Sequence, residues 1–230
     1  MRVQMKTLMV VALLAVVFTT IAPEAFAQRA GGKAREPMQF SLTYGSMWGG
    51  NIETGLGTLR TGTGGSLGFA LDVPIRPGMS LEASYTRQES SLDWDQRGSS
   101  VRTLSDMTVN VWHLGTLRDL APPTAKVIPY VQGSLGATFL SPSASEAVID
   151  GETYTLDGTT KFSIAFGAGF KTFFGEAQKV GLRGLFKVTS TLFDSSGGVY
   201  FGPGGASLGI SGYGIWQYEF AGGLVVKFGG

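Results

Sequence analysis

The sequence contains no cysteine and a single histidine, His113, among its 230 residues. The missing cysteines exclude a disulfide framework and a thiolate metal site, and one imidazole excludes any site that needs two. Charged residues make up only 15% of the chain and sum to a formal net charge of +1, so nucleic-acid binding has no electrostatic basis. Beyond the N-terminus, no segment reaches 18 uncharged apolar residues. A transmembrane helix is therefore not expected in the mature chain.

Glycine, in contrast, is abundant: 35 residues are Gly, more than twice the roughly 7% share of an average protein. The glycines follow no strict three-residue period and only 9 residues are proline, which excludes a collagen-like triple helix. Hydrophobic residues reach 43% and aromatic residues 11%, too apolar for a disordered chain. The composition indicates an ordered, apolar, glycine-rich β-protein.

Residues 1–27 are predicted to be a secretory signal peptide. Arg2 and Lys6 supply the basic start, Leu8–Ala22 is an uncharged run of 15 residues, and Ala25-Phe26-Ala27 places small residues at the cleavage site. The run is short for a membrane-spanning helix, which needs about 20 apolar residues. An uncleaved anchor is the alternative.

Residues 28–37 lack periodicity and are expected to form a flexible leader, after which apolar and polar residues alternate with a period of two. This alternation predicts one domain over residues 38–230 with eight β-strands. The strands are longer than the roughly 5–6 residues of globular sheets and meet the roughly 9–11 needed to cross a bilayer at a tilt. Ten strands would result only if the segment after Ser141 joined the sheet. The expected strands are Met38–Trp48, Thr63–Pro74, Met79–Ser90, Val101–Thr116, Val127–Leu140, Thr160–Phe174, Lys179–Phe193 and Ile215–Phe228.

The strands have apolar stripes that are together rich in Phe, and the opposite faces carry Gly, Ala, Ser and nearly all of the charges. Only Arg87 and Glu89 fall on the stripe. In a soluble β-sandwich or lipocalin-like barrel the stripe would form the core, whereas in a transmembrane barrel it faces lipid and the charges face the lumen. The fourth strand is less regular, with Met107, Val109 and Val111 on one face and Trp112 on the other. The charges opposite the stripes are Asp72, Glu82, Arg102, Asp106, Lys161, Lys171, Lys179, Arg183, Lys187, Glu219 and Lys227.

Three features favour the membrane. An eight-stranded interior has no room for a Phe-lined core. Connections such as Ile75–Gly78 and Gly175–Gln178 are short, whereas Ser141–Thr159 and the Gly/Ser-rich Asp194–Gly214 are long, an alternation typical of outer-membrane barrels. Four aromatic residues occupy positions that suit an interfacial girdle: Trp48 and Trp216 at the outer rim, Trp112 and Phe228 at the inner rim.

Five inward charges are expected to form a salt-bridged plug, because an eight-stranded lumen is filled by side chains and buried charges need partners. A charged channel is the alternative. The residues of this predicted network are Asp72, Glu82, Lys171, Arg183 and Glu219.

The chain resembles the small outer-membrane β-barrel proteins of diderm bacteria, the OmpA-barrel/OmpX-like group also called porin family proteins. The resemblance lies in Pro129–Ala137 (PYVQGSLGA), Phe166–Lys171 (FGAGFK) and the closing strand Tyr218–Phe228 (YEFAGGLVVKF). It implies a single eight-stranded antiparallel up-and-down transmembrane barrel in the outer membrane, with both termini and the leader in the periplasm. It also implies that lipid and lipopolysaccharide surround the barrel and that the barrel assembly machinery recognises the last strand. The positions that match this assembly signal are Gly222, Leu224, Val226 and Phe228, followed here by two further glycines.

No enzyme is expected. The G-x-S-x-G matches at Gly64–Gly68 and Gly205–Gly209 precede no predicted helix, and a hydrolase serine needs that strand-to-helix context. His113 is predicted on the lipid-facing side beside Trp112, near the periplasmic end of its strand. Small outer-membrane barrels that modify lipid A carry a His and a Ser two residues apart, and here Gly115 takes the second position.

The long loop Ser141–Thr159 holds four acids without EF-hand spacing, so no metal site is expected. Its segment Ala147–Tyr154 predicts a hairpin with an Asp-Gly turn. The sequence thus favours a monomeric barrel without cofactor, in a structural, adhesion or surface-interaction role. The alternatives are an OmpW-like transport barrel for small apolar solutes and, more weakly, a lipocalin-like binding protein or a lipid A-modifying enzyme.

Overall fold

The architecture is entirely of β-strands in this computed structural model, which describes residues 36–53, 57–96, 101–144, 146–149, 152–155, 158–192, 198–202, 205–209 and 214–229. The predicted signal peptide and all but the last two residues of the leader lie outside the described residues. Pro37–Gly229 forms one unit. Within the described ranges no helix is long and apolar enough to cross a membrane.

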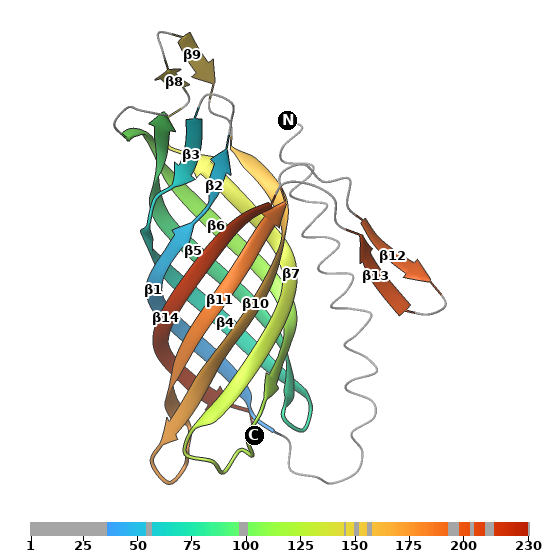
Figure 1. Ribbon diagram of the computed structural model, residues 1–230. Coiled ribbons are helices and arrows are strands. Elements are labelled where there is room, and N and C mark those ends of the chain that lie inside the picture. The colour runs from blue at the N-terminus through green and yellow to red at the C-terminus, as the bar shows by residue number, and fades with distance from the viewer. Residues whose placement is uncertain are drawn as a thin grey trace. The chain divides into compact units, whose positions relative to one another are not determined.

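Eight long antiparallel strands close into a barrel, which confirms the predicted fold class (Figure 1). Each strand pairs with its neighbours along the chain, and the last pairs with the first from Met38 opposite Phe228 to Gly49 opposite Gln217. The strands are β1 (Met38–Gly49), β4 (Gly64–Arg76), β5 (Met79–Gln96), β6 (Arg102–Asp119), β7 (Ile128–Pro142), β10 (Thr159–Phe174), β11 (Val180–Leu192) and β14 (Gly214–Phe228).

The two ends of the barrel differ in their connections. At one end, here the turn end, Pro77-Gly78 joins β4 to β5, residues 120–127 join β6 to β7 and residues 175–179 join β10 to β11. The first residue of β1 and the last of β14 lie at the same end, because Met38 pairs with Phe228. The opposite end, the loop end, carries three longer connections, residues 50–63, 143–158 and 193–213, and a short one, residues 97–101 between β5 and β6.

The predicted loops contain short hairpins. In the first, β2 (Asn51–Glu53) pairs with β3 (Gly57–Thr61), which in turn pairs with β5. This pairing extends β5 to Gln96, beyond its predicted end at Ser90. In the second, β8 (Glu146–Ile149) pairs with β9 (Glu152–Thr155) in a separate sheet, which confirms the predicted hairpin and keeps the barrel at eight strands.

A third hairpin lies in the long Gly/Ser-rich connection Asp194–Gly214, where no strand was predicted. There β12 (Gly198–Gly202) pairs with β13 (Gly205–Gly209) over five residues each. A β-ladder requires only backbone groups, so the glycine content does not prevent pairing. The two G-x-S-x-G segments open β4 and form β13, so neither serine stands at a strand-to-helix turn.

The barrel is apolar outside and polar inside. On β1, Ser41 and Thr43 are at most 7% exposed, whereas Tyr44 is 69% exposed. On β10 and β14, Phe166 and Phe220 are 66% and 64% exposed. Burying a large apolar side chain is worth about 1.5–3 kcal/mol, so this outer surface would be strongly unfavourable in water. Its polarity is that of a barrel surrounded by lipid.

On β6 the apolar face does not follow this rule. Met107, Val109 and Val111 are at most 5% exposed and pack with Leu92 of β5 inside the loop-end half of the lumen. The alternate residues of this strand face outward, and Asp106, which directly precedes Met107, is one of them and is exposed. The expectation that Asp106 faces the lumen is therefore wrong, because on this strand the apolar stripe is the lumen side.

Close strand packing explains part of the glycine content. A Cβ at Gly136 of β7 would collide with the carbonyl oxygen of Trp112 and the ring of His113, and one at Gly45 of β1 would collide with the backbone of β14. By contrast, Gly133 faces outward and would meet only the Phe166 ring at 3.7 Å. Glycine is thus required at particular positions on the lumen side of the wall.

Candidate functional site in the barrel lumen

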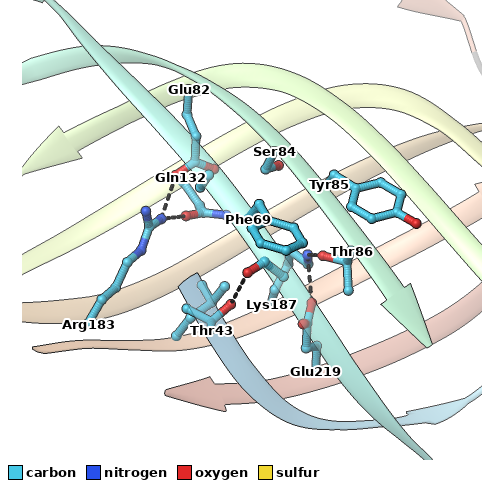
Figure 2. Close-up of a pocket in the computed structure, with 13 residues that line it drawn as sticks. Thr43, Phe69, Glu82, Ser84, Tyr85, Thr86, Gln132, Arg183, Lys187 and Glu219 are labelled. Atoms are coloured by element: carbon cyan, nitrogen blue, oxygen red, sulfur yellow. Dashed lines mark hydrogen bonds and ion pairs between the residues drawn. The ribbon is translucent and has the colours of Figure 1, made fainter. Parts of the chain in front are cut away.

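The lumen of the turn-end half is filled by a charged cluster centred on Arg183 of β11. Its Nη2 donates to Glu82 Oε2 at 2.5 Å and to Gln132 Oε1 at 3.0 Å (Figure 2). Its Nη1 lies 3.5 Å from Asp72 Oδ2, and its Nε donates to the Tyr130 hydroxyl at 2.9 Å. Arg183, Glu82 and Asp72 are at most 2% exposed. Nη1 also donates to Ser41 Oγ at 3.3 Å. The guanidinium is therefore held by residues from four other strands of the barrel wall, β1, β4, β5 and β7.

Lys171 of β10 extends this cluster. Its Nζ lies 3.4 Å from Asp72 Oδ2 and 3.3 Å from Asp119 Oδ1, and it donates to Gln39 Oε1 at 3.0 Å. The Tyr130 ring lies under both cations, with its centroid 5.3 Å from Lys171 Nζ and 4.9 Å from Arg183 Cζ. Asp72 and Tyr130 thus connect the two cations into one network.

A second cluster lies farther along the lumen, centred on Lys187 of β11. Its Nζ lies 2.6 Å from Glu219 Oε2 and donates to Thr86 Oγ1 at 3.0 Å (Figure 2). Ser66 Oγ donates to Glu219 Oε1 at 3.2 Å. Lys187 and Glu219 are 3% and 2% exposed. A cavity of about 20 Å³, lined by residues of both clusters, separates them. Such a volume holds about one water molecule.

The two clusters place opposite charges in direct contact along the lumen. Burying an ion is costly unless it is paired and its remaining polar atoms are hydrogen-bonded. Lys171, Arg183 and Lys187 each contact at least one carboxylate. The arrangement can therefore fill and brace the lumen, and the described residues around it contain no group of three or more potential metal ligands.

The structure divides the predicted charge network in two. Asp72, Glu82, Lys171 and Arg183 lie in the first cluster, and Glu219 lies in the second. Sequence reasoning did not assign Tyr130, Gln132, Asp119 or Lys187 to the network. Lys187 had a signal, because it lies four residues after Arg183 and so on the same face of the strand.

His113 lies inside the barrel, which corrects its predicted place on the lipid-facing side. It is 5% exposed, and its Nε2 lies 2.9 Å from Ser163 Oγ of β10. The prediction failed because Trp112, 54% exposed, points outward, so the next residue must point inward. His113 also lies mid-strand, since β6 continues to Asp119. Among the described residues, its Nδ1 has no hydrogen-bond partner.

The four predicted girdle residues occupy different levels. Trp48, near the loop end of β1, stacks on Tyr218 with ring centroids 6.3 Å apart, and Trp216 is 55% exposed near the same end of β14. Phe228 ends β14 at the turn end. Trp112 lies in the middle of β6, with its ring centroid 4.6 Å from that of Tyr85, and not at the inner rim.

The residues that match the assembly signal share the outer face of β14. Leu224, Val226 and Phe228 are 53%, 40% and 41% exposed, and Gly222 is exposed with them. The lumen side of the same strand carries Val225, which is fully buried. The alternation thus continues to the end of the strand.

Comparison with known proteins gives matches among solved structures but none by sequence. No protein-family model and no curated protein sequence matches the chain. Among solved structures, OprG from Pseudomonas aeruginosa matches with a TM-score of 0.55 and 13% identity over 86% of this chain and 99% of OprG. Neisserial surface protein A (NspA) matches with a TM-score of 0.50 and 14% identity over 86% and 100% of the two chains.

A third structure, a major outer membrane protein from Thermus thermophilus, matches with a TM-score of 0.50 and 14% identity over 83% of this chain and 99% of that chain. These similarities confirm the resemblance to small outer-membrane β-barrels at the level of fold. Identities this low carry no information on ligand or activity.

Proposed function

We propose that the mature protein is a non-enzymatic β-barrel of the bacterial outer membrane with a structural, adhesion or surface-interaction role and a lumen closed by ion-paired side chains. The observation that carries the proposal is the buried network of Arg183, Lys171, Asp72 and Glu82 beneath an apolar outer wall. A soluble lipocalin-like protein would need the opposite polarity, with apolar side chains in the lumen and charges in water.

The proposed orientation places the turn end in the periplasm and the loop end outside the cell. Long loops outside and short turns inside are the rule for outer-membrane barrels. The first residue of β1 and the last residue of β14 also lie at the turn end. The predicted signal peptide would deliver the chain across the inner membrane. The outer face of β14, ending in Phe228, would then be recognised by the barrel assembly machinery.

Because a closed lumen passes no solute, we place the function on the exposed surface of the barrel at its loop end. At the loop end, β3 pairs with the last residues of β5. Arg60 of β3 lies 2.6 Å from Asp95 of β5. The β8–β9 hairpin belongs to the connection between β7 and β10 at the same end. Paired strands hold a binding surface more firmly than an irregular loop does, which supports an adhesion or interaction role for this end.

The absence of enzymatic activity is also part of the proposal. His113 and Ser163 are in contact, but both are buried in the lumen. A nucleophilic serine needs a base that is itself oriented by a third group, and among the described residues His113 Nδ1 has no partner. The pair is better explained as a structural polar contact between β6 and β10.

One observation favours a second candidate, a transport barrel for small apolar solutes. The loop-end half of the lumen is apolar, with Leu92, Met107, Val109 and Val111 packed beside Leu140. Such a lining would accept an apolar solute, although the charged clusters lie below it. Uptake of a radiolabelled apolar solute into liposomes that contain the barrel tests this candidate. A Val109→Lys variant, which places a charge in the apolar lining, should lose this uptake.

Extraction and gel mobility test the membrane location. Folded outer-membrane barrels resist SDS until boiled, so the expressed protein should stay in the membrane fraction after a high-salt wash and change its gel mobility on heating. A protein that is released by salt and shows no mobility change would overturn the proposal.

A further inference from the structure

Two arginines flank one methionine at the turn end of the barrel. Arg76 ends β4 and pairs with Met79, the first residue of β5, and Met79 in turn pairs with Arg118 of β6. Directly opposed residues on neighbouring strands point to the same face of a sheet. On β6 that face is the outside, since Trp112 and Arg118 are six positions apart, which puts them on the same face, and both are exposed. Arg76 has the lumen parity of Asp72 and Pro74, but a register shift between Pro74 and Arg76 places it opposite Met79, and it is exposed. Both arginines therefore lie at the rim of the outer wall.

Neither guanidinium has an ion-pair or hydrogen-bond partner among the described residues. Other arginines of the barrel are paired: Arg60 with Asp95, Arg87 with Glu89 and Arg183 with Glu82. The acid next to Arg118 in sequence, Asp119, instead pairs with Lys171 inside the lumen at 3.3 Å. Within the part of the chain that the structure describes, two positive charges thus remain uncompensated at one place on the outer wall.

The wall above the two arginines is apolar. Along the outer face of β5, Met79 is followed by Leu81, which pairs with Val73 of β4. Ala83, two residues farther on, pairs with Leu71. The arginines therefore stand where the apolar surface meets the turns, at the depth where lipid acyl chains give way to headgroups.

We propose that Arg76 and Arg118 bind the headgroup phosphate of an anionic phospholipid in the periplasmic leaflet, with its acyl chains lying on the apolar wall of β4 and β5. The strands on either side of β5, β4 and β6, are about 10 Å apart. Two arginine side chains can bridge this distance over Met79. Guanidinium groups bind phosphate bidentately. This inference rests on the proposed membrane location and orientation.

The charge of the site selects the lipid. A zwitterionic headgroup adds a cation beside its phosphate, which two unpaired guanidinium groups would repel, whereas phosphatidylglycerol adds none. The loop end offers no equivalent on the described outer wall, because Arg87 there is neutralised by Glu89 at 3.1 Å. The site therefore suits the phospholipid leaflet at the turn end and not the phosphates of lipopolysaccharide.

Native mass spectrometry of the mature protein, refolded in detergent with equal amounts of phosphatidylglycerol and phosphatidylcholine of identical chains, tests the site. The wild type should retain one phosphatidylglycerol in preference to phosphatidylcholine. The double variant Arg76→Gln with Arg118→Gln should reduce this retention about tenfold. Lys126→Gln with Lys179→Gln is the matched control, because it removes two exposed bases from the same end of the barrel and should leave retention unchanged.

Equal loss in both double variants would overturn the site in favour of a general charge effect. Retention of both lipids alike by the wild type, or of neither, would overturn it as well. The heat-dependent gel shift, measured on the same samples, separates the two proposals. A folded barrel without lipid preference contradicts only the lipid site, whereas a protein without the shift contradicts the membrane barrel itself.

Discussion

Arg183 of β11 and Glu82 of β5 meet inside the barrel, with Nη2 2.5 Å from Oε2 and both residues 2% exposed. The two strands are not neighbours in the sheet, so the pair spans the lumen. Asp72, Tyr130 and Gln132 surround the same guanidinium. The contact therefore joins opposite parts of the wall and makes the interior of the turn-end half a single braced unit.

Removing the cation should destabilise the barrel. Arg183→Met leaves Glu82 and part of the charge of Asp72 without a partner inside the lumen, and breaking a buried ion pair costs about 3–5 kcal/mol. Urea unfolding of the protein in lipid vesicles, followed by tryptophan fluorescence, measures the loss. Arg87→Met is the control, because Arg87 is exposed and paired only at the surface; it should change stability by less than about 1 kcal/mol. Equal effects of the two variants would contradict the bracing role.

The double variant Glu82→Gln with Arg183→Met should recover part of that loss. Replacing both members of a buried pair removes the unpaired charge that makes the single variant costly. A double-mutant cycle from the same unfolding data should give a coupling energy of about 1–3 kcal/mol. Additive effects of the two substitutions would show that the pair contributes no coupling.

Gly136→Ala should impair folding more than Gly133→Ala, although the two glycines lie on the same strand. A Cβ at Gly136 would collide with the Trp112 carbonyl oxygen, whereas one at Gly133 makes ordinary contact with the Phe166 ring at 3.7 Å. Overpacking of this kind costs about 1–3 kcal/mol. Refolding yield into vesicles measures the difference. If Gly133→Ala is the worse of the two, the assignment of lumen and lipid faces on β7 is wrong.

Substitution of either member of the buried His113–Ser163 contact should lower the stability of the barrel and leave the chemical structure of lipid A unchanged. Ser163→Val removes the partner of His113 Nε2, 2.9 Å away, and an unsatisfied buried polar group costs about 1–3 kcal/mol. Mass spectra of lipid A from cells that express the wild type and His113→Ala should be identical. A mass difference between them would contradict the non-enzymatic function.

The sequence predicts the fold well because alternation with a period of two is a local signal. All eight barrel strands lie where the alternation placed them, and the differences concern their ends. β5 reaches Gln96 because β3 and β6 pair with its residues beyond Ser90, and alternation within one strand does not reveal such partners. The Gly/Ser-rich segment that contains β12 and β13 was missed for the opposite reason, since its composition weakens the strand signal.

The lumen could be predicted only in part. Alternation gives the face of each residue but not its height, so it could not separate Glu219 from the cluster around Arg183. Lys171 and Asp72 lie 99 residues apart, and their contact depends on closure of the barrel. On β6, apolar residues fill the lumen, so hydrophobicity alone reversed the two faces and placed Asp106 and His113 on the wrong sides.

Single-channel recording in planar lipid bilayers tests the central claim, that the ion-paired clusters close the lumen, most directly. The wild-type barrel should show no stable conductance steps, because Arg183, Lys171 and Lys187 fill the interior together with their carboxylate partners. Asp106→Asn, an exposed position on the outer wall, should behave the same. Stable conductance steps from the wild type that change in size with Glu82→Ala or Arg183→Ala would contradict the closed lumen and show that these charges line an open channel.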